Sequence, residues 1–232
     1  MTSICLFGAS GRMGQAIAEV ACERDDFAIV EDSCDVYVDF SAPDGLDHHL
    51  ELALESGKPI VIGTTGLGAD HLRAIDRAAA RIAVLQAANM SLGVNLLAHL
   101  VRQASSMLGN DWDIEIVEMH HRQKVDAPSG TALLLGSAAA QGRGADLADI
   151  SDRGRDGMTG PRADGHIGFA SLRGGSVAGD HQVIFASEGE RLELGHRAES
   201  RTIFARGAVQ AALWIADKPA GRYRMTDVLG LK

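Results

Sequence analysis

The first ninety residues alternate between short apolar runs and stretches with the spacing of amphipathic helices. The apolar runs, which are separated by glycine-rich or polar turns, cover residues 3–7, 27–30, 35–40, 59–62 and 82–85. Helical spacing follows the first run and returns at residues 48–56 and from 68 or 70 to 80. Fully apolar strands that alternate with helices are typical of a parallel sheet covered on both faces. We therefore expect an α/β fold with a Rossmann-like sheet in this part of the chain.

The pattern changes after this region. A long apolar helix is predicted for residues 92–107, and strands for residues 113–117, 166–172, 181–186 and 191–195. Because turns rather than helices separate most of these strands, we expect an antiparallel or mixed sheet. An alanine-rich helix at residues 202–216 offers apolar side chains that could pack back on the first domain. The predicted domains are residues 1–91 with 205–232, and an α+β domain of residues 92–204.

A glycine-rich turn, Gly8-Ala9-Ser10-Gly11-Arg12-Met13-Gly14, follows the first apolar run directly. The order strand, glycine-rich turn, helix is typical of a dinucleotide site, because glycines let the backbone approach a pyrophosphate closely and the helix start supplies N–H donors. The spacing differs from the commoner Gly-x-Gly-x-x-Gly, so a tight turn without a ligand is the alternative. The turns Gly63-Thr64-Thr65-Gly66 and Gln86–Ser91 would meet it at the carboxyl edge of the sheet.

The second apolar run ends at Glu31-Asp32, where an acid often binds the adenosine ribose. Only two residues separate these acids from the next strand, which is too short for a crossover helix. We therefore expect an abbreviated or irregular sheet here and assign neither acid. His48 and His49 lie on the next helix without metal-ligand spacing, so we expect a solvated face there.

The most chemically distinctive stretch is Glu118-Met-His-His-Arg-Gln-Lys-Val-Asp-Ala-Pro-Ser-Gly-Thr131. It follows the predicted strand at residues 113–117 and precedes helix formers that begin at Ala132. We therefore expect it on a loop between a strand end and a helix start, where catalytic groups are often found. Asp126 or Ser129 could cap the helix.

The backbone N–H groups of residues 129–131 would then face outward at the helix start, where a carboxylate is favoured. His120, His121 and Lys124 add proton donors to the same small space. This combination predicts an enzyme that acts on an acidic small molecule. The two histidines alone are more often surface or core residues, and Pro-Ser-Gly-Thr alone is most often only a helix start.

Composition limits the partners of the protein. The 232 residues carry a net charge of −9, which argues against a nucleic-acid partner. A local cluster of cations can still hold an acidic substrate. The three cysteines form no Cys-x-x-Cys pair, so we expect free thiols in a reducing compartment. With no signal peptide and no stretch long enough to span a bilayer, we expect a cytoplasmic protein without a membrane partner or a metal site.

Five motifs together resemble the 4-hydroxy-tetrahydrodipicolinate reductase family, also called the dihydrodipicolinate reductase family. They are the glycine-rich turn at residues 8–14, Gly63-Thr-Thr-Gly66, Ala87-Ala-Asn-Met-Ser-Leu-Gly-Val-Asn95, the stretch from Glu118 to Thr131, and Ser200-Arg-Thr-Ile-Phe-Ala-Arg-Gly-Ala208. The resemblance runs almost end to end. It implies a Rossmann domain closed by a C-terminal helix, a substrate domain with a mixed sheet, and a homotetramer built through those sheets.

The resemblance also implies a reaction and its residues. NADH or NADPH would deliver hydride to a cyclic dicarboxylate substrate with loss of its 4-hydroxyl group. His120 would be the proton donor or acceptor and Lys124 a proton donor, and His121, Gly130 and Thr131 would bind the substrate. The cofactor would lie against Gly8, Ala9, Ser10, Gly11, Arg12, Met13, Gly63, Thr64, Thr65, Ala87, Ala88, Asn89 and Met90.

The chain departs from the family in one place. Members usually carry a few dozen more residues between the second strand and the Asp-Phe-Ser strand, and here residues 31–35 replace them. The choice between NADH and NADPH is therefore not implied, and Arg12 is the nearby candidate for a 2′-phosphate. Two rival hypotheses are a dehydrogenase of another acidic metabolite, of an aspartate or homoserine type, and a nucleotide-sensing regulator that has lost the chemistry.

Overall fold

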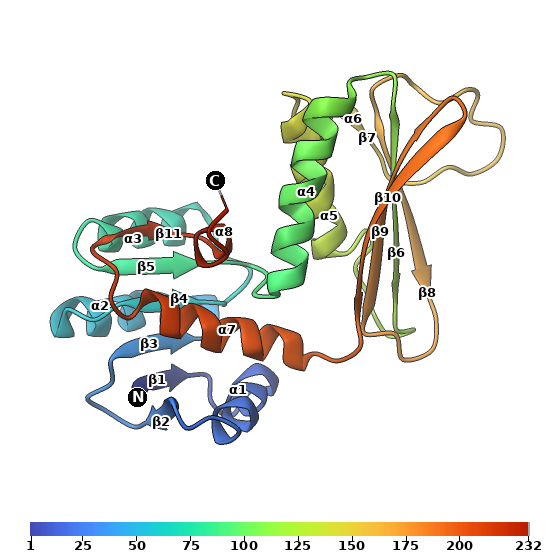
Figure 1. Ribbon diagram of the computed structural model, residues 1–232. Helices are drawn as coiled ribbons and strands as arrows, with labels where there is room; N and C mark the ends of the chain where they lie inside the picture. Colours follow the sequence, from blue (N-terminus) through green and yellow to red (C-terminus); the bar gives the residue numbers. More distant parts are fainter. Residues whose placement is uncertain (232) are drawn as a thin grey trace. The chain divides into compact units, whose positions relative to one another are not determined.

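The structure, a computed structural model, describes residues 1–231 and contains two compact units. Residues 1–92 and 201–231 form unit 1, and residues 93–200 form unit 2. Figure 1 shows that the red C-terminal segment lies against the blue-to-cyan sheet of unit 1. Unit 1 is thus completed by the last thirty or so residues of the chain.

Unit 1 contains a six-stranded sheet in which all neighbouring strands are parallel, in the order β11-β5-β4-β3-β1-β2. The strands are β1 (Thr2–Phe7), β2 (Phe27–Val30), β3 (Val36–Asp39), β4 (Ile60–Ile62), β5 (Ala83–Gln86) and β11 (Gly221–Tyr223). The first five confirm the strands expected from the apolar runs. The sequence analysis missed β11, because its residues Gly-Arg-Tyr form no apolar run.

Helices cover both faces of this sheet. They are α1 (Arg12–Cys22), α2 (Leu46–Ser56) after the short turn η1 (Pro43–Gly45), α3 (Ala69–Ala79), α7 (Thr202–Ile215) and the short α8 (Met225–Val228). Val61 of β4 packs in one core with α1 and α7, whereas Ile60 and Ile62 pack in a second core with α2 and α3. Because successive side chains of each strand enter different cores, the strands are apolar throughout. The predicted α/β class is confirmed.

The carboxyl ends of four neighbouring strands lie side by side. Phe7 of β1 pairs with Asp39 of β3, and Asp39 pairs with Ile62 of β4. Ile62 in turn pairs with Gln86 of β5. The segments that follow these residues therefore leave the sheet at one edge, next to the point where the chain order reverses around β1. Ligands bind at this edge in open parallel sheets.

The link between β2 and β3 contains no helix. These two strands flank β1 on opposite sides, and β2 ends level with Cys5 while β3 begins level with Ile4. The link therefore has to step back by only one residue along β1, which five residues can do. The Cys5 thiol donates a hydrogen bond to the Glu31 carbonyl oxygen (3.7 Å) in this crossing. The expected irregularity is thus a short, helix-free crossover.

Unit 2 contains a five-stranded mixed sheet in the order β10-β9-β6-β8-β7. Strand β6 is parallel to β8 and antiparallel to β9, so the expectation of a mixed sheet is confirmed. The strands are β6 (Asp113–His120), β7 (Ser151–Asp152), β8 (Ile167–Arg173), β9 (Gly179–Ser187) and β10 (Glu190–Ala198).

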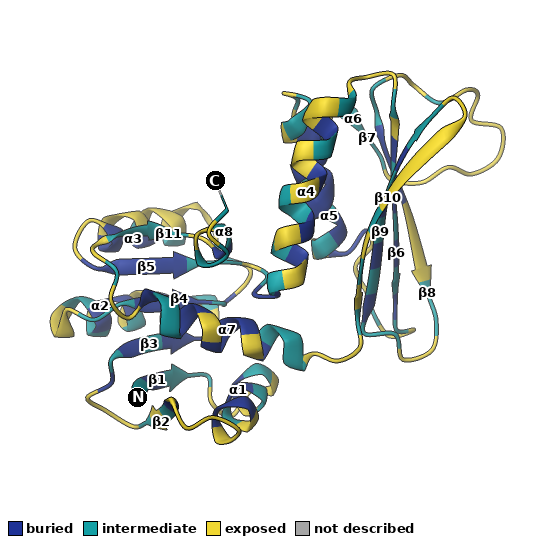
Figure 2. Ribbon diagram, in the orientation of Figure 1, coloured by how far each residue is buried: buried dark blue, intermediate teal, exposed yellow. Residues whose placement is uncertain are grey.

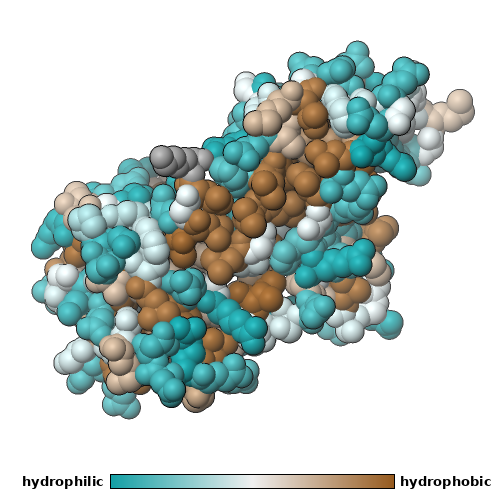
Figure 3. All heavy atoms as spheres, in the orientation of Figure 1, coloured by the Kyte–Doolittle hydropathy of each residue, from teal (hydrophilic) through white to brown (hydrophobic). Residues whose placement is uncertain are grey.

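Helices α4 (Leu92–Leu108) and α5 (Gly130–Gly142) pack in one apolar core with alternate residues of β6, β8 and β9. Figure 2 shows this core in dark blue, and it shows the exposed first residues of β10, 190–193, in yellow. Leu172 of β8 and Leu192 of β10 remain 50% and 38% exposed. Figure 3 shows further apolar side chains gathered along α4, where Leu96 and Leu100 are exposed.

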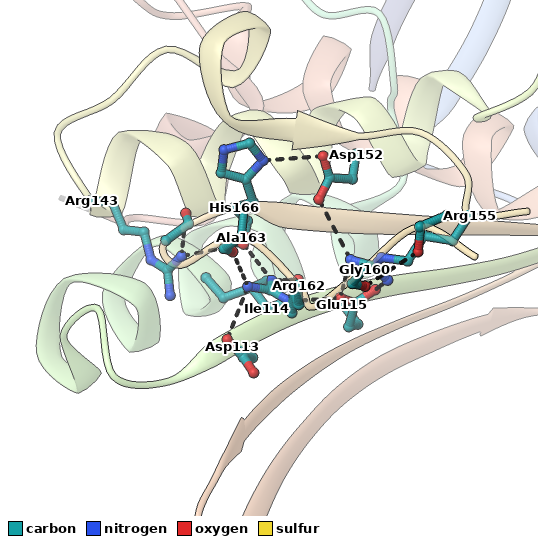
Figure 4. A network of polar contacts seen from close by, with 12 residues as sticks. Asp113, Ile114, Glu115, Arg143, Asp152, Arg155, Gly160, Arg162, Ala163 and His166 are labelled. Atoms are coloured by element: carbon teal, nitrogen blue, oxygen red, sulfur yellow. Dashed lines mark hydrogen bonds and ion pairs between the residues drawn. The ribbon is translucent and has the colours of Figure 1, made fainter. Parts of the chain in front are cut away.

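The segment at residues 142–165 is more ordered than its composition suggests. We expected a long loop, and this was wrong for α6 (Leu147–Ile150) and for β7. The Asp146 side chain accepts a hydrogen bond from the Ala148 N–H group (2.9 Å) and so caps α6. Farther along, Arg155 and Arg162 both bind the carboxylate of Glu115 on β6, as Figure 4 shows.

Candidate functional site

The glycine-rich turn after β1 allows the backbone to pack closely. Gly8 has a φ angle of 80°, and a Cβ atom there would lie 2.4 Å from the Phe40 carbonyl oxygen. A Cβ atom at Gly14 would lie 2.3 Å from the Gly8 carbonyl oxygen, so the start of α1 rests directly on the turn. Residues 9–12 are exposed, while Met13 is half-buried. An exposed helix start over a closely packed glycine turn fits a dinucleotide pyrophosphate.

A buried carboxylate organises the neighbouring turns. Asp39, at the end of β3, is fully buried and accepts a hydrogen bond from the Thr64 hydroxyl (3.0 Å). The Thr64 hydroxyl is therefore engaged inside the protein, whereas Thr65 is exposed. His49 donates to the other Asp39 oxygen (3.1 Å) and stacks on Phe7, so the expectation of a solvated face was wrong for His49.

The third turn of this edge, residues 87–90, packs partly into unit 1. Ala88 is exposed, but Met90 is buried. A Cβ atom at Gly207 of α7 would lie 1.8 Å from the Met90 carbonyl oxygen, so the glycine lets this backbone approach the helix. Ser91 donates its N–H group to the Asn89 side chain (2.9 Å). The turns at residues 8–14, 63–66 and 87–90 thus lie at the same edge of the sheet, because the strands that precede them end level with one another.

In unit 2, His120 is the last residue of β6, as expected for a group at a strand end. Every second residue of β6 is buried, and His120 belongs to this inward set with Ile114, Ile116 and Glu118. The His120 side chain is only 10% exposed. Its Nδ1 atom lies 2.6 Å from the Glu118 carboxylate, which leaves Nε2 as the ring atom available to a substrate.

The Glu118 carboxylate is ionised although it is almost fully buried. Arg173 of β8 donates one hydrogen bond to each of its oxygens, both at 2.9 Å. Burial acts to raise the pKa of Glu118, but hydrogen bonds from Arg173, His120 and Ser171 outweigh it, and the pKa lies below its ordinary value. A carboxylate at this position can therefore hold the Nδ1–H group of the imidazole.

The helix after the central loop starts where the sequence places it. Ser129 is the N-cap of α5, because its hydroxyl accepts a hydrogen bond from the Ala132 N–H group (3.2 Å). The expectation that the Ser129 N–H group faces a ligand was wrong, since it donates to Glu118 (3.3 Å). Gly130 is exposed, and a Cβ atom there would meet no atom within 4 Å. Thr131 is half-buried beside it.

Lys124 lies on the turn between His120 and this helix. Its N–H group donates to the His121 carbonyl oxygen (3.1 Å), and the His121 N–H group donates to the Val177 carbonyl oxygen (2.8 Å). The Lys124 ammonium lies 2.8 Å from Asp126, and this hydrogen bond lowers the pKa of the Asp126 carboxyl. Asp126 therefore orients Lys124 rather than capping α5.

A second histidine, His181 of β9, lies against His120. The two rings meet edge to face with their centroids 5.0 Å apart. The Ser129 hydroxyl, which accepts from the helix, also forms a hydrogen bond with His181 Nε2 (3.1 Å). Burial, with the field of His120, lowers the pKa of His181 to about 4. His181 is therefore neutral at physiological pH.

Three residues of this arrangement, Glu118, Arg173 and His181, received no role from the sequence alone. Glu118 had a usable signal, because an acid two residues before His120 on a half-buried strand must face the same side. Arg173 and His181 are 53 and 61 residues after His120, and only strand pairing brings them to it. Within residues 1–231, no group of three or more His, Cys, Asp or Glu residues could hold a metal ion.

Family models match both parts of the chain. A family model described as the N-terminus of dihydrodipicolinate reductase matches residues 24–90, and one described as its C-terminus matches residues 93–229. The N-terminal match begins after the glycine-rich turn.

Two relatives match nearly the whole chain. The 4-hydroxy-tetrahydrodipicolinate reductase of Zymomonas mobilis subsp. mobilis is 61% identical over 98% of this chain and 97% of its own length. The enzyme of the same name from Caulobacter vibrioides is 48% identical over 99% and 97%. The solved structure of a dipicolinate-bound dihydrodipicolinate reductase from Paenisporosarcina sp. TG-14 has the same fold, with a TM-score of 0.79, 21% identity and 98% coverage of each chain. The resemblance drawn from the motifs is thus confirmed, and the chain belongs to the 4-hydroxy-tetrahydrodipicolinate reductase family, also called the dihydrodipicolinate reductase family.

Proposed function

We propose that this protein reduces 4-hydroxy-tetrahydrodipicolinate to tetrahydrodipicolinate with NADH or NADPH, in the diaminopimelate route of lysine biosynthesis. Relatives that carry the name of this reaction cover almost the whole chain, which supports the proposal. In the balanced reaction, a hydride and a proton are added to the substrate and its 4-hydroxyl group leaves as water. The reduced nicotinamide supplies the hydride when it is bound.

The dinucleotide belongs at the carboxyl edge of the sheet in unit 1. We assign the pyrophosphate to residues 8–13, where an exposed helix start follows a tightly packed glycine turn. Residues 63–65 and 87–90 leave the same edge through the aligned ends of β4 and β5. Arg12, which is exposed at the first position of α1, remains the proposed contact for a 2′-phosphate.

The observation that carries the proposed chemistry is the position of His120. Its imidazole is held by a buried carboxylate beside the exposed start of α5, with Lys124 on the turn between them. The start of α5 at Gly130 and Thr131 favours a carboxylate group of the substrate. Hydride addition to a conjugated imine increases electron density in the ring, which a nearby acid must neutralise. We assign that proton to His120, with Lys124 as a second proton donor and His121 as a substrate contact.

The assembly and location are also proposals. Leu172 pairs with the outward residue Met119 and so lies on the face of the unit 2 sheet that α4 and α5 do not cover, and its exposed apolar side chain supports a homotetramer joined through these sheets. Along residues 1–231, no helix has the length and apolar character needed to cross a membrane. A biosynthetic reaction that uses a cytosolic reductant is consistent with a cytoplasmic protein.

The decisive assay supplies the condensation product of aspartate semialdehyde and pyruvate and follows the oxidation of NADH and NADPH separately. We expect turnover with at least one nucleotide, and a loss of at least about 100-fold in His120→Ala and in Lys124→Ala, because a positioned proton donor contributes about that much. Nucleotide binding, measured by nicotinamide fluorescence, should be unchanged in both variants. The exposed His48 provides the control, and His48→Ala should keep full activity.

The same assay separates the rival functions. A nucleotide-sensing regulator would bind NADH or NADPH but show no turnover with this substrate. A dehydrogenase of an aspartate or homoserine type would turn over its own substrate and leave the condensation product unchanged. Wild-type rates in both His120→Ala and Lys124→Ala would rule out the assigned roles.

A further inference from the structure

Glu118 is the group on which the proton-transfer site converges. It is 1% exposed, and its carboxylate accepts hydrogen bonds from three separate elements. Its Oε2 atom lies 2.6 Å from His120 Nδ1 and 2.9 Å from Arg173 Nη1. Its Oε1 atom accepts from Arg173 Nη2 (2.9 Å) and from the Ser129 N–H group at the start of α5 (3.3 Å). One carboxylate therefore joins the imidazole, the neighbouring strand and the helix start.

We propose that Glu118 is a positioning residue for the reduction: it holds the His120 proton at Nδ1, directs Nε2 toward the substrate, and stabilises the charged imidazolium. This inference rests on the proposed function, since it needs His120 to transfer a proton. An ionised carboxylate can only accept, so the hydrogen on the Glu118 side must sit on Nδ1. Nε2 is then the ring atom that gives the proton to the substrate.

The remaining groups around the imidazole fit this assignment. His181 of β9 packs edge to face on it and is neutral, so it adds no competing charge. Arg173 of β8 keeps Glu118 ionised, and the ammonium of Lys124 is paired with Asp126. Two charges therefore dominate the electrostatic field at His120: the negative charge of Glu118, 2.6 Å away, and the positive charge of Arg173, which binds the same carboxylate.

This balance predicts opposite effects for two variants. Glu118→Gln removes the negative charge, so the imidazolium loses its proton at lower pH. We expect kcat to fall about 10²-fold, and the alkaline limb of the kcat/KM profile to move down by about one pH unit. Arg173→Gln removes the positive charge instead, and its alkaline limb should move to higher pH. Glu118→Asp retains the negative charge, and we expect its kcat to be about tenfold higher than that of Glu118→Gln.

Glu115 provides a matched control on the same strand. It also accepts hydrogen bonds from arginines, Arg155 and Arg162, but it lies at an outward position of β6 (Figure 4). Glu115→Gln thus removes a carboxylate–arginine network of the same kind without touching His120. We expect it to keep the wild-type pH profile and kcat. Dichroism and molecular mass in solution would establish that each variant is folded and assembled.

The outcomes separate this inference from the proposed function. A wild-type protein without turnover, or an unaffected His120→Ala variant, ends the proposed function itself. If His120→Ala is inactive but Glu118→Gln keeps the wild-type kcat and pH profile, only the role of Glu118 is overturned. An equal loss in Glu118→Gln and Glu115→Gln with unshifted profiles would likewise leave Glu118 with a structural role. If Glu118→Gln does not fold, the pH profile of Arg173→Gln tests the inference instead. An alkaline limb of its kcat/KM profile that does not move, or that moves to lower pH, overturns the role of Glu118.

Discussion

Gly179 of β9 faces the imidazole of His120 on the adjacent strand β6. A Cβ atom at position 179 would lie 2.9 Å from His120 Nε2 and 3.4 Å from its Cδ2 atom. The distance to Nε2 is shorter than a real Cβ atom tolerates, whereas the distance to Cδ2 is at the lower limit of ordinary van der Waals contact. The absence of a side chain at Gly179 therefore leaves room for the ring atom to which we assign proton transfer.

Gly179→Ala should consequently lower activity without affecting the nucleotide site. The added methyl group displaces the imidazole or fills the space in front of Nε2, and a misplaced proton donor loses on the order of 10²-fold in kcat. Steady-state kinetics and NADH titration would measure the two effects. Gly195→Ala on β10 is the control, because its Cβ atom would meet the nearest atom, the His181 carbonyl oxygen, at 3.4 Å. Equal kcat values for both variants would contradict this prediction.

Gly14→Ala should destabilise unit 1 and weaken nucleotide binding. The new Cβ atom would collide with backbone atoms of Gly8 and Ala9, which cannot move away as a flexible side chain can. Overpacking of this kind costs about 1–3 kcal/mol. Thermal unfolding and nicotinamide fluorescence would test both effects. Gly68→Ala at the start of α3 should change little, because the nearest atom lies 3.9 Å away on the His71 side chain; a larger loss there than at Gly14 would contradict the argument.

His181 should make folding stability depend on pH. Its pKa is about 4 in the folded protein, below the ordinary value of 6.5, so between these values the unfolded chain binds a proton that the folded chain does not. The free energy of unfolding therefore decreases as pH falls through this window, by up to about 1.4 kcal/mol per pH unit. Urea titrations from pH 4.5 to 7 should show a weaker dependence in His181→Gln than in the wild type. His48→Gln, at an exposed site, should retain the wild-type slope, and identical slopes in all three proteins would refute the assignment.

Two arginines of one loop should differ in their contribution to stability. The Arg162 side chain is 18% exposed and binds Asp113, Glu115 and the backbone of β6, whereas Arg155 is 39% exposed (Figure 4). Arg162→Ala removes a charged donor that binds the half-buried Glu115 carboxylate and the Ile114 carbonyl oxygen, and we expect a loss of about 2–3 kcal/mol in the free energy of unfolding. Arg155→Ala should cost less than about 1 kcal/mol, because its ion pair is more exposed to water. Chemical unfolding and limited proteolysis of residues 153–166 would show the difference, and a reversed order would contradict it.

The sequence predicted the elements that depend on local patterns. The apolar runs predicted β1 to β5, because strands buried on both faces contain little else. Ser129, one of the two expected caps, marked the start of α5, since a hydroxyl cap acts within one turn of the helix. By contrast, Gly221–Tyr223 of β11 has no pattern of its own and becomes a strand only by pairing with β5.

The sequence by itself determined the glycine-rich turn, the central motif with His120 and Lys124, and hence the family. These signals lie within short stretches, where backbone conformation and side-chain type act together. Only the tertiary structure decided which groups surround His120: strand pairing delivers Arg173 and His181, and the fold buries Glu118 so that its charge must be satisfied inside the protein. Contacts between residues distant in the chain depend on sheet register and burial, which no local pattern specifies.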